Sequence, residues 1–445
     1  MQTPMNKTLF LCVVCMLATL SPGFTQENTG GWSLRKCIDY AREHNIQVQA
    51  SRLSDQSGQV DLSQARAQLF PSLVFSSNQG WAHQKTEQTN GDMKSQGTYS
   101  GSYSLSSGLT LYNGGRLTNS IKRQEMATEV LGYRVDKVGN DIEIAVTEAF
   151  LQILYAHESL KTNHLTVERS QAQRERTQGL LEAGSVALSD LAQIEAQYNN
   201  DLYRVIQAEN ALAMAKLELK QLLELDGDEA FDIYIADVNE GQVLTPIPPV
   251  EEVYRTALEV MPEIKNSRLG IEMAELSEKI AAADRLPNLS LNASVGSGHN
   301  SQSDLALGRQ LDNRLNESIS VGISIPISRN RQVKSAVEKA RLETEQAQLD
   351  EINSRKSLWR TIESLHQNAV AAQSRYIASS NSVRAATESY RLVQAQFEEG
   401  MRNTVELLTE KNNYLSALQE QIQAKYQAAL SIRLLHFYQN HPIEL

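Results

Sequence analysis

The sequence repeats itself with a constant offset of 216 residues. Ser51–Leu53 recurs as Ser267–Leu269, and 268 lies 216 positions beyond 52. Glu182–Gly184 recurs in a related form as Glu398–Gly400, and Tyr198 recurs at the same offset as residue 414. A constant offset over this distance predicts two copies of one structural unit. Each copy reads in the order helix, strand, strand, very long helix, glycine break and long helix.

The N-terminus predicts export. Lys7 precedes the apolar run Leu9–Leu20, and the turn-prone segment Ser21–Gln26 comes next. This order is typical of a secretory signal peptide, which we assign to residues 1–25, and the run is too short for a transmembrane helix. Two of the three cysteines lie inside this segment, so Cys37 remains alone and an internal disulfide is excluded.

The formal charge of −11 argues against a nucleic-acid partner, which would require a basic surface. No later segment is apolar over eighteen residues, so we expect no transmembrane helix in the mature chain. Barrel strands that cross a membrane escape such a scan because they alternate.

Four segments alternate with the period of a strand, and we place strands at 72–82, 98–112, 288–297 and 317–327. Between residues 99 and 111, for example, the odd positions are mainly apolar and the even positions mainly serine. Alternate side chains of a strand point to opposite faces. An apolar face suits lipid and a small polar face suits a wet pore. Each strand alone fits an ordinary sheet equally well, but four at matching places favour a barrel. The expected pore-facing residues are Ser100, Ser102, Ser104, Ser106, Ser290, Asn292, Ser294, Ser320 and Ser324.

Four strands are too few to close a barrel, which needs about eight. An open sheet edge is not viable in lipid, because its backbone groups would lack partners. The barrel must therefore be shared between chains. A trimer would supply twelve strands and a dimer eight.

Residues 116–181 lack proline, and residues 331–397 lack both proline and glycine. A helix of about 65 residues is about 100 Å long. Gly184 and Gly400 end these helices as left-handed caps, and Ser189 and Thr404 are the expected N-caps of the next two helices. Beyond Gly400 a heptad-like seam predicts coiled-coil packing. It comprises Val405, Leu408, Asn412, Leu415, Gln419, Ile422, Tyr426 and Ala429.

The chain resembles the TolC-like outer-membrane efflux proteins over nearly its whole mature length. The motifs that carry the resemblance are Leu69–Leu73, Leu111–Arg116, Ile325–Ile327 and the two tip segments, 184–190 and 397–406. The resemblance implies a mixed α/β membrane protein of two tandem repeats. A long coiled-coil α-helical barrel would continue into a transmembrane β-barrel shared by three chains. The expected divisions are residues 26–225, a connector at 226–250, residues 251–440 and a short end at 441–445, with helical hairpins at 116–224 and 331–440.

The resemblance further implies a passive efflux duct in the outer membrane, with a long periplasmic extension. Its expected partners are two further copies of itself, outer-membrane lipid, a periplasmic adaptor protein and an inner-membrane pump, without cofactors or metals. The hairpin tips would form the periplasmic gate. The gate residues implied by motif are Ser189, Asp190, Phe397, Arg402, Glu406 and Thr409. Phe397 and Thr409 depart from the family pattern, which often has tyrosine and aspartate there.

Three alternatives stay open. A channel for type I protein secretion would share this architecture. A periplasmic coiled-coil spacer would not explain the four strands. An enzyme would need a site, and the sequence offers only His157 and His164, two helical turns apart and without a third ligand.

Overall fold

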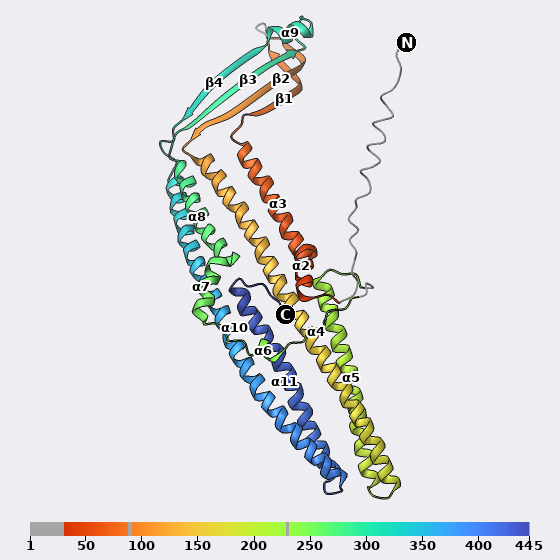
Figure 1. Ribbon diagram of the computed structural model, residues 1–445. Coiled ribbons are helices and arrows are strands. Elements are labelled where there is room, and N and C mark those ends of the chain that lie inside the picture. Colours follow the sequence, from red (N-terminus) through yellow and green to blue (C-terminus); the bar gives the residue numbers. More distant parts are fainter. Residues whose placement is uncertain (1–30, 88–90, 228–230, 445) are drawn as a thin grey trace, which may run out of the picture.

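The computed structural model describes residues 31–87, 91–227 and 231–444, so the expected signal peptide lies outside the described residues. The molecule is elongated (Figure 1). A four-stranded sheet occupies one end, and two helical hairpins reach the other. The C-terminus lies beside the middle of the long helices.

The long helices of the two halves have equal lengths. Helices α4 (Arg116–Glu182) and α10 (Gln332–Glu398) each have 67 residues. Helices α5 (Leu188–Leu222) and α11 (Thr404–Tyr438) each have 35. Each long helix of the second half begins 216 residues after its counterpart, as 332 follows 116. At 1.5 Å per residue, α4 and α10 are about 100 Å long.

Two helices, rather than the single expected one, precede the strands in each half. Helices α2 (Leu34–His44) and α3 (Ile46–Ala67) have the same lengths as α7 (Val250–Val260) and α8 (Pro262–Ala283). Asn45 divides the first pair, because its side chain accepts a hydrogen bond from the Gln47 N–H (2.9 Å) and so starts a new helix. Pro262 divides the second pair. It is the first residue of α8, a position where proline is favoured because its missing N–H would have no partner within the helix.

The sheet is antiparallel, in the order β1-β2-β3-β4. Its strands are β1 (Ser72–Glu87), β2 (Met93–Asn113), β3 (Asn288–Asn300) and β4 (Asn316–Ser324). Strands β1 to β3 extend beyond their predicted bounds through mainly polar residues without a clear apolar alternation. Strand β4 ends earlier than residue 327, because Pro326 lacks the N–H that would continue the ladder. A short helix that was not expected, α9 (Leu307–Asn313), lies between β3 and β4.

The buried core lies midway along the long helices, where the short helices pack around them. It includes Phe150, Ile153, Leu219, Ile264 and Leu435, none of which is more than 1% exposed. The connector belongs to this region. It contains the one-turn helix α6 (Glu240–Val243) and a parallel bridge between Ile233 and Trp32. Towards the tips, the two helices of each hairpin pack mainly against each other, and the hairpins meet along a narrower seam.

Candidate functional site

The strand register places all the expected pore-facing residues on one face of the sheet. Ser106 pairs with Ser294, and Asn292 pairs with Ser320. Directly paired residues point to the same face, and the remaining members lie at steps of two. The opposite face is apolar, since Leu291 lies between Leu109 and Val321.

The expected apolar row is wrong at one point, where β2 contains a β-bulge. The register of β2 against β3 shifts between Thr110 and Tyr112, so Tyr112 pairs with Leu289. A bulge inserts one extra residue into one strand and changes which side chains share a face beyond it. Tyr112 therefore takes the place in the row that the alternation gave to Leu111.

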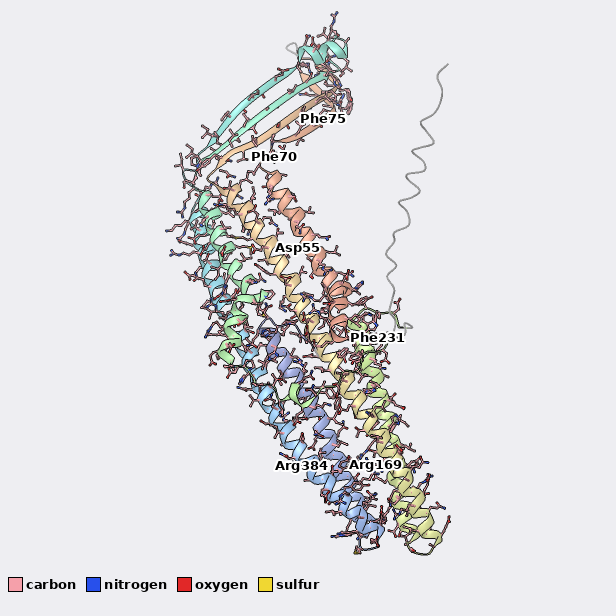
Figure 2. All side chains as sticks on the ribbon, viewed as in Figure 1. Asp55, Phe70, Phe75, Arg169, Phe231 and Arg384 are labelled. Atoms are coloured by element: carbon pink, nitrogen blue, oxygen red, sulfur yellow. The ribbon has the colours of Figure 1, made fainter. Side chains whose placement is uncertain are left out.

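Neither face of the sheet is packed against the long helices, which continue from one end of it (Figure 1). Phe75 lies on β1, beyond the end of α3 (Figure 2), and it is 68% exposed. Ile319 on β4 is 81% exposed. An antiparallel sheet in a water-soluble domain normally buries its apolar face. Here an apolar face, a small polar face and two strand edges all remain open in the single chain.

The two hairpin tips lie at the opposite end of the molecule and share one turn geometry. At the first tip, the Ser185 N–H donates to the Leu180 carbonyl (2.8 Å), and the Gly184 N–H donates to that of Leu181 (2.9 Å). Gly184 has a φ of +71°, so this is the glycine cap known as a Schellman motif.

The second tip repeats the motif at Gly400, whose φ is +74°. Here the Met401 N–H donates to the Gln396 carbonyl (2.8 Å) and the Gly400 N–H to the Phe397 carbonyl (3.0 Å). Helices α5 and α11 start earlier than expected, and this corrects the two predicted N-caps. Ala187 and Asn403 are the N-cap residues of α5 and α11. Ser189 and Thr404 therefore lie inside the first turns.

Asp190 joins the two tips within one chain. Its Oδ2 atom accepts a hydrogen bond from the Ala187 N–H (3.1 Å) and so helps to cap α5. Its Oδ1 atom accepts a hydrogen bond from the Thr404 hydroxyl of the other hairpin (2.8 Å). A second contact joins the ends of the two long helices, because Arg176 Nη1 lies 3.0 Å from Glu398 Oε1.

Arg402 bonds within its own hairpin. Its Nη1 atom lies 2.8 Å from Glu406 Oε1, and its Nε donates to Gln396 Oε1 (3.0 Å). Glu406 Oε2 accepts a hydrogen bond from the Asn403 N–H (3.1 Å). This backbone N–H, and then Arg402, lower the pKa of Glu406 below its usual value. In the single chain, Arg402 and Asp190 are therefore held by different partners.

The other expected gate residues differ in exposure. Ser189 and Thr409 are exposed, and the Thr409 hydroxyl donates to the Val405 carbonyl one turn earlier (2.8 Å). Phe397, in contrast, is buried.

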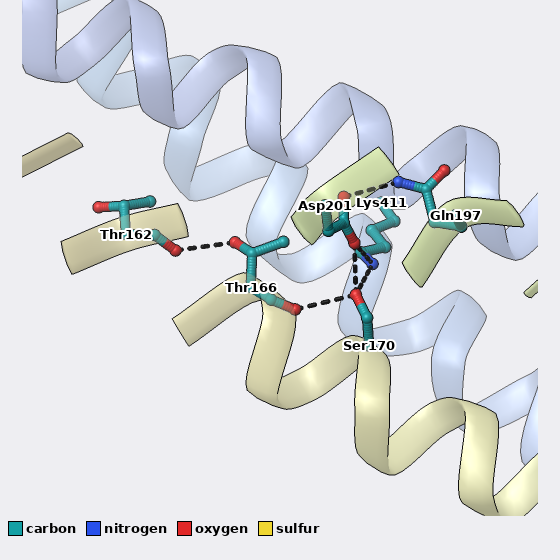
Figure 3. Close-up of polar contacts among 6 residues, drawn as sticks. All are labelled: Thr162, Thr166, Ser170, Gln197, Asp201 and Lys411. Atoms are coloured by element: carbon teal, nitrogen blue, oxygen red, sulfur yellow. Dashed lines mark hydrogen bonds and ion pairs between the residues drawn. The ribbon is translucent and has the colours of Figure 1, made fainter. Parts of the chain in front are cut away.

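Sequence reasoning missed a buried polar cluster between the hairpins (Figure 3). Lys411 of α11 reaches Asp201 Oδ2 of α5 at 2.7 Å, and its Nζ also donates to the Ser170 hydroxyl of α4 (2.6 Å). The Ser170 hydroxyl also bonds to Asp201, and Gln197 Nε2 donates to Asp201 Oδ1 (2.8 Å). The Asp201 side chain is 0% exposed and that of Lys411 9%. We call Ser170, Asp201 and Lys411 the seam cluster.

The seam between the hairpins stays polar above this cluster. Gln419 Nε2 donates to the Tyr155 hydroxyl (2.7 Å), and the Ser159 hydroxyl donates to Gln419 Oε1 (3.2 Å). Further up, Lys425 lies 2.9 Å from Glu158 Oε2, which also accepts the Tyr426 hydroxyl hydrogen bond (2.6 Å). The Asp190–Thr404 contact thus begins a ladder of polar contacts along α11.

Within the described residues, no helix is both long and apolar enough to span a membrane, and no group of three metal-ligating side chains forms.

Comparison with known proteins identifies the family. The family profile described as outer membrane efflux protein matches residues 37–224 and again 253–437, which together make up most of the chain. The chain belongs to the outer membrane efflux protein family. It is accordingly an efflux protein of the outer membrane.

Two relatives illustrate the range of the family. The chain is 23% identical to the alkaline protease secretion protein AprF of Pseudomonas aeruginosa over 406 residues, which cover 89% of this chain and 82% of that protein. It is 24% identical to the outer membrane protein TolC of Escherichia coli over 432 residues, which cover 95% and 84%.

Solved structures share the fold. The chain matches a crystal structure of CusC with a TM-score of 0.76 at 16% identity, covering 93% of this chain and 95% of that one. It matches the outer membrane protein VceC of Vibrio cholerae with a TM-score of 0.75 at 14% identity, covering 91% and 96%.

Proposed function

We propose that three copies of this chain form a continuous duct, in which the sheets close a twelve-stranded barrel in the outer membrane and the helices form a tube across the periplasm. The observation that carries this proposal is the sheet with two open faces and two open edges. Strand β1 has 16 residues and β4 has 9, and each has a neighbour on one side only. An unpaired backbone group in lipid costs several kcal/mol, so these edges need partners from other chains.

The duct we propose is passive and delivers small molecules from a periplasmic adaptor and an inner-membrane pump to the exterior. The helical hairpins support the periplasmic part, because helices of about 100 Å exceed any compact domain. Their tips would be the end that meets the adaptor.

A protein-secretion role is the second candidate. It is favoured by the names of two relatives, AprF and the proteases secretion protein PrtF of Dickeya chrysanthemi, which is 23% identical over 444 residues. Copurification of the pump after mild crosslinking in the native cells distinguishes the two roles.

We propose that the tips close the duct through Asp190, Arg402 and Glu406. Within the chain, Arg402 uses its Nε and Nη1 atoms. Its Nη2 donors would bond to a carboxylate of the neighbouring protomer. Each such exposed contact is worth about 0–1 kcal/mol, but a cyclic trimer repeats it three times. An adaptor that binds the open form more tightly would then shift the equilibrium.

The assembly test is native mass measurement in detergent, where we expect a stable trimer. A stable monomer would contradict the shared barrel. The gate test is single-channel conductance in planar bilayers. We expect the double variant Asp190→Ala/Arg402→Ser to conduct more than the parent.

The matched control is Glu388→Ala/Arg391→Ser. It removes an exposed acidic and basic pair of α10 (2.6 Å) away from the tip and should leave conductance unchanged. If the gate variant assembles and conducts like this control, the tip charges are surface groups without a latch function.

A further inference from the structure

The weakest plane of the periplasmic part lies between the two hairpins. Helix α4 packs along α5, and α10 along α11, far more extensively than α11 packs against α4 or α5. Each hairpin is therefore the more rigid unit, and relative movement would occur at the seam between them.

The contacts across this seam differ in burial with their distance from the tip. Near the tip, the Arg176 and Glu398 side chains are 48% and 30% exposed, so water reaches both when they part. Seven residues beyond Thr404, about 10 Å along α11, Lys411 and Asp201 are almost fully buried. Parting these two leaves a buried charge without its partner unless the seam is flooded.

The seam cluster also fixes the relative position of three helices. Lys411 comes from α11, Asp201 from α5 and Ser170 from α4, and all three hydrogen-bond to one another. Gln197 occupies the other oxygen of the Asp201 carboxylate. Because the donors and acceptors match in one arrangement, sliding α11 along α5 would break several bonds together.

We propose that Asp201 and Lys411 are positioning residues of the gate, which stop the seam from opening beyond the segment between the tip and the cluster. The proposal rests on the gate proposed above and adds a limit to its movement. Tip contacts would break and reform with each opening, while contacts above the cluster would stay closed. The cluster thereby sets the width of the opening.

The test uses cysteine pairs below and above the cluster, in a Cys37→Ser background that removes the remaining mature thiol. The lower pair is Asp190→Cys/Thr404→Cys and the upper pair is Ser159→Cys/Gln419→Cys. Both replace side chains that already touch across the seam, at 2.8 and 3.2 Å. Conductance is measured in planar bilayers for the oxidised protein and again after reduction.

We expect oxidation of the lower pair to abolish the conductance gained when the tips open, with recovery on reduction. Oxidation of the upper pair should leave conductance unchanged. In the background Asp201→Leu/Lys411→Met, which keeps the seam filled without charge, the open conductance should rise. The upper disulfide should then remove that increase.

The stop is overturned if the upper disulfide blocks the otherwise unmodified channel as fully as the lower one does. It is also overturned if the Asp201→Leu/Lys411→Met channel assembles and conducts like its parent, since a purely structural pair would change only thermal stability. If the lower disulfide has no effect on a conducting channel, the gate proposal fails instead. Should the apolar variant not assemble, Asp201→Asn/Lys411→Gln carries the same test, because it removes charge and keeps hydrogen bonding.

Discussion

Replacing Leu291 by arginine tests which face of the sheet meets lipid. Leu291 lies near the centre of the part of β3 that pairs with β4, between Leu109 and Val321 on the apolar face. Arginine on the lipid face near the middle of a bilayer costs about 2–4 kcal/mol. At about 1.4 kcal/mol for each tenfold change, the folding equilibrium in membranes shifts about 30- to 700-fold per chain.

Asn292→Arg is the matched control, because the next residue lies at nearly the same depth and points to the other face. Its neighbours across the sheet are Gly108 and Ser320, and a charge in a wet pore costs little. We expect urea titration of refolding into lipid vesicles to show a large loss for Leu291→Arg and a small one for Asn292→Arg. Equal losses, or a larger loss for Asn292→Arg, would refute the assigned faces.

The remaining predictions concern turns and pH. Gly400→Ala should cost about 1 kcal/mol in urea unfolding, since the alanine must adopt a positive φ but its Cβ meets nothing within 4 Å. Gly114→Ala should cost more, because its Cβ would also lie 2.8 Å from the Cβ of Leu286; equal costs would contradict the clash. Burial raises the pKa of Glu143, although Arg42 opposes the shift. The stability that Glu143 contributes should therefore be fully present below pH 4.5 and be lost as pH rises through this raised pKa. In thermal unfolding, Glu143→Gln should lose that part of the pH dependence.

Much of the architecture could be predicted because it depends on local pattern. The absence of proline between Arg116 and Glu182 permits one long helix, and positive φ at Gly184 is explained by its place after that helix. The alternation of apolar and polar residues with a period of two predicted which residues share a face of the sheet. The bulge before Tyr112 could not be predicted, since it depends on how β2 meets β3, a strand far along the chain.

The seam of α11 shows a second limit of prediction from the sequence. The apolar heptad pattern suggested Val405 and Leu408 as seam residues near the tip, but Val405 is 59% exposed. The buried positions there are Thr404, Leu407 and Lys411. Lysine is rarely buried without a partner, and that partner, Asp201, lies 210 residues away in the sequence. The spacing of seven from Thr404 to Lys411 was the available signal.

Because α4 and α10 have equal lengths, the two hairpin tips lie at the same level and can contact each other. Removing one heptad from α4 and the heptad that packs beside it in α5 would raise the first tip by about 10 Å relative to the second, and the Asp190–Thr404 contact could not form. Removing the matching heptads from α10 and α11 as well would shorten the whole molecule by that amount and keep the two tips at one level. Insertions and deletions in the hairpins should therefore be tolerated when all four long helices change together.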